Sequence, residues 1–67
     1  MKQKPRLLII DPSLTAIERF LNHPKAKQFQ IDSATTGPLA LKKVKEFEPD
    51  LVIIDLMIQH IHGIEVI

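Results

Sequence analysis

Two aspartates, Asp11 and Asp55, each follow a run of apolar residues that no polar residue interrupts. The runs are Leu7–Ile10 and Leu51–Ile54, and they are typical of strands that helices cover on both faces of a parallel sheet. Side chains at the carboxyl ends of such strands point into the crevice where open α/β sheets bind ligands. We therefore expect both carboxylates at one edge of the sheet, where ligands bind and chemistry takes place.

Two histidines form a second candidate site. His60 and His62 lie close to Asp55 in the sequence, and imidazole and carboxylate groups together can ligate a transition metal. A spacing of two residues in a loop is weak support for such a site. Solvated loop histidines are the preferred interpretation.

The bulk composition narrows the class of protein. The chain has 67 residues, a net charge of +1 and no cysteine, so we expect one domain without disulfides, thiolate catalysis or cysteine metal sites. Asp11 interrupts the first apolar stretch before a signal-peptide core forms, and no run reaches the length of a membrane span. Three lysines have Glu46 and Glu48 beside them, which favours a solvated helix face over a nucleic-acid patch; they are Lys42, Lys43 and Lys45. We expect a soluble, cytoplasmic chain without direct contact to nucleic acid or membrane.

Three further elements connect and follow the apolar runs. Apolar residues at spacings of three and four predict a helix from Ser13 to about Asn22, and Thr15 with Glu18 could form a capping box at its start. A shorter edge strand is predicted from Phe29 on, because Phe29 and Ile31 alternate with polar residues. The segment Thr35–Pro38 is predicted to open a second helix, whose apolar stripe is expected in the core: Ala40, Leu41, Val44 and Phe47. Residues 57–62 are predicted to form a loop, and a third helix would begin at Ile64.

The order of elements predicts the topology of the sheet. Strand, helix, strand, helix, strand implies right-handed parallel crossovers, with the first strand between the other two in the order 2-1-3. An apolar third strand at the edge would leave backbone groups unpaired, and such edges invite pairing with another chain. We therefore expect self-association through the edge of the third strand.

Both apolar runs belong to a familiar pattern. Leu7–Asp11, the two helices and Pro49–Met57 followed by Gly63 resemble the first three strands and two helices of a response-regulator receiver domain. The resemblance covers nearly all of this chain but only about the first half of the family's doubly wound, flavodoxin-like fold. It implies that residues 1–67 form a partial receiver domain, a βαβαβ unit of the α/β class completed by self-association.

The resemblance also implies a chemistry. Asp55 would be the phosphoacceptor, which takes a phosphoryl group from a histidine kinase or phosphotransfer protein of a two-component system. A carboxylate can act as the nucleophile, and a divalent cation offsets the charge of the phosphoryl group. The implied ligands of that Mg²⁺ are Asp11, Asp55 and the backbone carbonyl of Met57.

The chain departs from the family pattern in three respects. The second acidic position after the first strand holds Pro12, which offers no side-chain oxygen, so we expect weakened Mg²⁺ affinity. Gln59-His60 and His62-Gly63 replace the usual Pro-Gly and Asp-Gly pairs. The 67 residues also contain no counterpart of the fourth and fifth strands, which carry a hydroxyl residue and a lysine in the family.

Two functions follow from this comparison. The first is a receiver-type phosphoacceptor module with Asp55 as acceptor and Asp11 as a metal ligand. The alternative is a pseudo-receiver or half-domain that acts by protein contact and dimerises through the third strand, which Pro12 favours. An enzyme in its own right is not expected, since neither a general base nor a closed pocket is indicated.

Overall fold

A three-stranded parallel sheet forms the centre of the molecule. The computed structural model describes residues 3–55. Strand β1 (Arg6–Ile10) lies between β2 (Gln30–Ala34) and β3 (Leu51–Ile54), and it pairs in parallel with both of them. The predicted strand order 2-1-3 and the α/β class are therefore confirmed.

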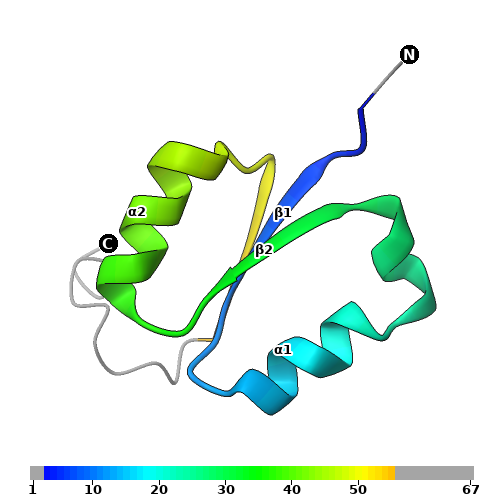
Figure 1. Cartoon of the computed structure of the whole chain (residues 1–67), viewed down its shortest axis with the longest axis horizontal. Helices are drawn as coiled ribbons and strands as arrows, with labels where there is room; N and C mark the ends of the chain where they lie inside the picture. Colours follow the sequence, from blue (N-terminus) through cyan, green and yellow to red (C-terminus); the bar gives the residue numbers. More distant parts are fainter. Residues whose placement is uncertain (1–2, 56–67) are drawn as a thin grey trace.

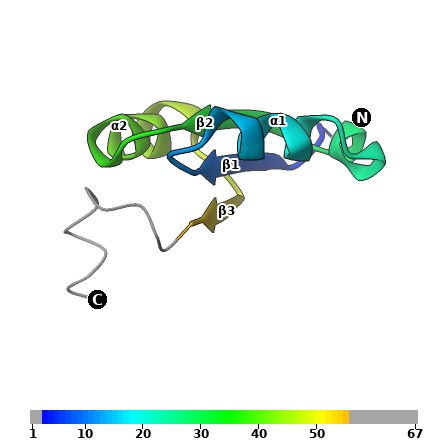
Figure 2. The same ribbon diagram turned by 90° about the horizontal axis from the view of Figure 1, so that it is seen from below.

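In the described part of the chain, two α-helices cover opposite faces of this sheet (Figures 1 and 2). Helix α1 spans Leu14–Leu21 and helix α2 spans Gly37–Phe47. Alternate residues of β1 supply the two small cores. The core on the α1 side contains Leu7, Ile9 and Ile17, and the core on the α2 side contains Leu8, Ile10, Ala34 and Ala40. Because β1 is buried on both faces, it behaves as the predicted central strand.

Hydroxyl residues begin both helices. The Ser13 side chain accepts a hydrogen bond from the Ala16 N–H at 3.3 Å, and the Thr36 side chain accepts one from the Leu39 N–H at 3.3 Å. Such caps satisfy backbone donors that the first turn leaves without partners. The capping box suggested at Thr15 is wrong, because the helix has already begun at Leu14.

A short 3₁₀ helix, η1 (Pro24–Gln28), occupies what the sequence suggested was only a polar connection. His23 caps it, because its Nδ1 atom accepts a hydrogen bond from the Lys25 N–H at 3.1 Å. Proline in the first turn suits a helix start, since that position needs no backbone donor. The pair His23-Pro24 therefore ends α1 and begins η1.

Two expectations about burial are wrong. Strand β3 is not covered on both faces: Leu51, Val52 and Ile53 keep 52%, 42% and 39% of their surface exposed. Helix α2 packs on β2 and β1, so β3 receives little cover from it. Two members of the predicted α2 stripe are also exposed, Leu41 at 64% and Val44 at 43%.

The remaining predicted elements fall outside the described residues. These are the loop at 57–62 and the third helix beginning at Ile64. Within residues 3–55, no helix is long and apolar enough to cross a membrane.

Candidate functional site

The backbone brings Asp11 and Asp55 to the same edge of the sheet. Ile10 and Ile54 are paired residues of β1 and β3, and each aspartate comes directly after one of them. The Asp55 N–H donates a hydrogen bond to the Ile10 carbonyl at 2.9 Å, and the Asp11 N–H donates one to the Ala34 carbonyl at 3.0 Å. Each aspartate is thus tied to the neighbouring strand, at the carboxyl end where open α/β sheets bind ligands.

The side chain of Asp11 has a structural role at the start of α1. Its Oδ1 atom accepts a hydrogen bond from the Ser13 N–H at 2.9 Å, which forms a local turn before the helix. An ionised carboxylate has two oxygens with about four acceptor positions, so this bond leaves capacity for a cation. Asp11 can therefore shape the turn and bind a metal ion at the same time.

The donor set partly suits Mg²⁺. Asp11 and Asp55 are half-buried carboxylates, and Mg²⁺ prefers oxygen ligands of this kind together with several waters. Pro12 is exposed between Asp11 and the helix cap and offers no side-chain oxygen. Among residues 3–55, no three acidic, histidine or cysteine side chains gather into a metal-binding group. The third implied ligand, Met57, lies outside the described residues.

A comparison with protein families decides the class to which this arrangement belongs. The family model of the response regulator receiver domain matches residues 7–67. The chain belongs to the response regulator receiver family. No curated protein matched the chain, and no solved structure matched it.

Membership in the receiver family fits the observed order of strands and helices. The order β2-β1-β3 with helices on both faces is that of a partial flavodoxin-like receiver fold. The family places this chain among the receiver modules of two-component signalling. Receiver domains generally bind Mg²⁺ and interact with histidine kinases or phosphotransfer proteins.

The predicted lysine face needs a correction at one position. Lys42 and Lys45 are exposed, as a solvated helix face requires. Lys43 is half-buried, and its Nζ atom lies 2.9 Å from Oδ2 and 3.0 Å from Oδ1 of Asp32 on β2. This ion pair joins α2 to β2 between residues that are eleven positions apart in the sequence. No sequence pattern predicts a pair at that spacing. His60 and His62, the candidate transition-metal ligands, lie outside the described residues.

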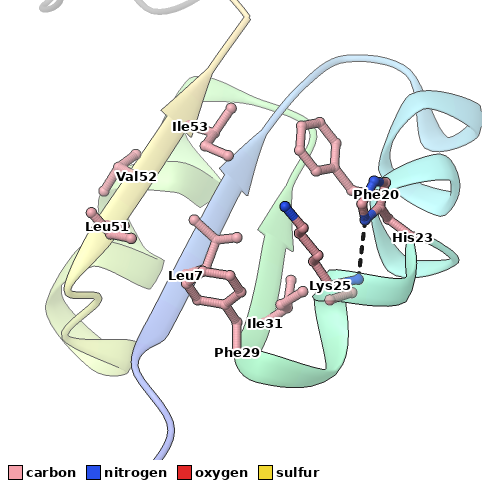
Figure 3. Close-up of a pocket in the computed structure, with 10 residues that line it drawn as sticks. Leu7, Phe20, His23, Lys25, Phe29, Ile31, Leu51, Val52 and Ile53 are labelled. Atoms are coloured by element: carbon pink, nitrogen blue, oxygen red, sulfur yellow. Dashed lines mark hydrogen bonds between the residues drawn. The ribbon is translucent and has the colours of Figure 1, made fainter.

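An apolar groove on the α1 side of the sheet is a feature that sequence reasoning missed. It has a volume of about 320 Å³ and runs between the α1–η1 segment and β3 (Figure 3). Its lining includes Leu7, Phe29, Leu51 and Ile53, with Lys25 reaching over it from η1. Neither Asp11 nor Asp55 lines the groove, so it is separate from the pair of carboxylates.

Proposed function

We propose that this chain is the phosphoacceptor module of a two-component or phosphorelay protein and that Asp55 is the acceptor. The observation that carries the proposal is the placement of Asp55 and Asp11 at adjacent strand ends, with the Asp55 N–H bound to the Ile10 carbonyl. This backbone bond fixes where the Asp55 side chain leaves the sheet. Family membership supports the same role.

The proposed transfer uses the Asp55 carboxylate as nucleophile. One carboxylate oxygen attacks the phosphorus of a phosphohistidine on a histidine kinase or phosphotransfer protein. A P–O bond forms while the P–N bond breaks, and the imidazole nitrogen keeps the electron pair and takes up a proton. The product is an acyl phosphate on Asp55. Because the partner supplies the phosphoryl group, we propose that the chain is an acceptor and not an independent enzyme. We also propose a cytoplasmic location, which suits a chain without cysteine.

Asp11 and Asp55 would hold Mg²⁺ in this proposal, with the Met57 carbonyl as a further ligand. The ion would offset the negative charge that gathers as phosphoryl and carboxylate groups meet. Asp11 contributes charge next to the acceptor while its Oδ1 atom holds the turn before α1. Since Pro12 contributes no side-chain oxygen, we propose that the affinity for Mg²⁺ is lower than a second carboxylate there would give.

Beryllofluoride with Mg²⁺ tests this proposal, because the reagent mimics a phosphoryl group on a carboxylate. In ¹⁵N–¹H NMR spectra of the chain we expect shifts around Asp55, Ile10 and Asp11, and their loss in Asp55→Asn. Glu46→Gln, which removes a carboxylate from the exposed face of α2, is the matched control and should keep the shifts. Spectra that saturating reagent leaves unchanged would overturn the acceptor role.

A second candidate function is a half-domain that works by protein contact. The observation that favours it is β3, an edge strand whose Leu51, Val52 and Ile53 are all exposed. Apolar edge strands are templates for pairing with another chain. Sedimentation equilibrium over a wide range of concentration tests this function. A dimer is expected, and a well-folded monomer at the highest concentration would exclude it.

A further inference from the structure

The Asp11 carboxylate belongs to a turn that three consecutive residues form after β1. Its Oδ1 atom accepts a hydrogen bond from the Ser13 N–H at 2.9 Å, across the intervening Pro12. Ser13 also begins α1, because its carbonyl accepts from the Ile17 N–H at 3.2 Å and its hydroxyl oxygen accepts from the Ala16 N–H at 3.3 Å. The position of the carboxylate is thus linked to the first turn of α1.

The core holds the elements on both sides of this turn. The Asp11 N–H donates to the Ala34 carbonyl of β2 at 3.0 Å, so β2 fixes the backbone of the residue that carries the carboxylate. Helix α1 carries the donor, and its Ile17 is buried in the core on the α1 side of the sheet. The rotation of the Asp11 side chain and the backbone of residue 12 are what remains to be fixed.

Another aspartate of the chain shows an arrangement that is closed to Asp11. The Oδ1 atom of Asp32 accepts a hydrogen bond from the N–H of the next residue, Ser33, at 2.8 Å. Aspartate side chains bind neighbouring backbone N–H groups in several such patterns. Asp11 cannot adopt this one, since the next residue is proline and has no N–H. Pro12 therefore leaves the Ser13 N–H as the nearest following donor.

The proline ring also restricts the backbone on both sides of its nitrogen. It fixes φ of Pro12 at roughly −65°, and it disfavours the α region for the residue before it. Asp11 is thereby kept in the extended conformation that the end of a strand requires. At a compatible position, proline removes chain entropy that corresponds to about a two- to fivefold change in an equilibrium. Both effects favour a single arrangement of residues 11–13.

We propose that Pro12 is a positioning residue, which holds the Asp11 carboxylate in the turn and so keeps it ready for the metal ion. This inference rests on the proposed function, in which Asp11 and Asp55 hold Mg²⁺. A group that is in its binding-competent arrangement for only part of the time binds with an affinity reduced by that fraction. Pro12 raises the fraction for Asp11. For Mg²⁺, proline at position 12 is then worse than a second carboxylate but better than alanine.

The couplings between the Hα and Hβ protons of Asp11 test the positioning in the metal-free chain. We expect the unaltered chain to show couplings of a single side-chain rotamer and Pro12→Ala to show couplings averaged over several. Pro24→Ala is the matched control, because it removes an exposed proline at the start of η1 and should leave the Asp11 couplings unchanged. Averaged couplings in the unaltered chain, or a single rotamer in Pro12→Ala, would overturn the proposal.

A titration with Mg²⁺, followed by ¹⁵N–¹H NMR, tests the consequence for the metal site. The concentration that half-saturates the shifts at Asp11 should be about two- to fivefold higher in Pro12→Ala than in the unaltered chain or in Pro24→Ala. An equal or lower concentration in Pro12→Ala would refute the effect of Pro12 on the metal site.

Asp11→Asn separates this inference from the proposed function. The asparagine side chain keeps an oxygen that can accept from the Ser13 N–H but loses the charge, so this variant should stay folded and lose the Mg²⁺ shifts. If the unaltered chain shows no shifts with Mg²⁺, the proposed metal role of Asp11 fails. The metal-free couplings then still decide whether Pro12 positions the Asp11 side chain.

Discussion

Glu48 at the end of α2 is the residue at which a substitution should stabilise the chain. It has φ 52° and ψ 61°, and it is the one non-glycine residue with positive φ among residues 3–55. The left-handed conformation costs a residue with a Cβ atom about 1–2 kcal/mol, whereas glycine adopts it readily. Glycine also raises the entropy of the unfolded chain, which offsets roughly 0.5–1 kcal/mol of that gain. We expect Glu48→Gly to raise the free energy of unfolding by about 0.5–1 kcal/mol.

Thermal unfolding followed by far-ultraviolet circular dichroism measures this effect, since the chain has neither tryptophan nor tyrosine for fluorescence. For a domain of this size, 1 kcal/mol corresponds to a shift in Tm of about 4–8 °C. Glu48→Ala is the control for the lost charge and should change Tm little. Glu46→Gly is the control for the effect of glycine itself. Because residue 46 lies inside α2, this variant should have a free energy of unfolding lower by about 1 kcal/mol. If Glu48→Gly is no more stable than Glu48→Ala, backbone strain at Glu48 does not limit stability.

Three further predictions concern the ties between elements and the metal site. Arg6→Ala should lower the free energy of unfolding by about 1–3 kcal/mol, because the Arg6 guanidinium donates to the Phe47 carbonyl at 3.0 Å and lies 5.9 Å from the centre of the Phe47 ring. An unchanged midpoint of denaturant unfolding would contradict this prediction. A double-mutant cycle of Lys43→Met and Asp32→Asn should give a coupling of about 0.2–1 kcal/mol that falls with added salt, and a salt-independent value would exclude an ionic origin. Pro12→Asp should lower the Mg²⁺ concentration that half-saturates the NMR shifts, whereas Pro12→Ala should not.

The arrangement of the sheet could be predicted because its signals are local. Uninterrupted apolar runs ending in Asp11 and Asp55 mark two neighbouring strands, and the chirality of crossovers then leaves few topologies. The same logic placed both aspartates at one edge of the sheet, where their backbone bonds are found. Helix caps were harder to assign, since Ser13 and Thr15 are both suitable cap residues, and the structure uses Ser13.

The parts that could not be predicted depend on contacts between distant segments. An apolar run shows that a strand can be buried, but the burial of Val52 depends on whether other elements lie over it. Leu41 has the spacing of a core residue, yet α2 makes its contact through Gly37, Ala40 and Phe47. The pairing of Lys43 with Asp32 likewise depends on how α2 crosses β2. Periodicity identifies a face of a helix but not the width of the contact it makes.

The two proposed functions use the same strand in different ways. The acceptor Asp55 is tied to β1 through its N–H, whereas Val52 and Ile54 direct their backbone groups away from β1, on the side where the second function needs its contact. Alternation along β3 thus separates the anchoring of the acceptor from the contact with a second copy. A folded Val52→Pro variant should accordingly lose the dimer and keep the beryllofluoride shifts at Asp55. If the shifts disappear with the dimer, pairing of β3 is needed to hold the acceptor, and the two functions are one.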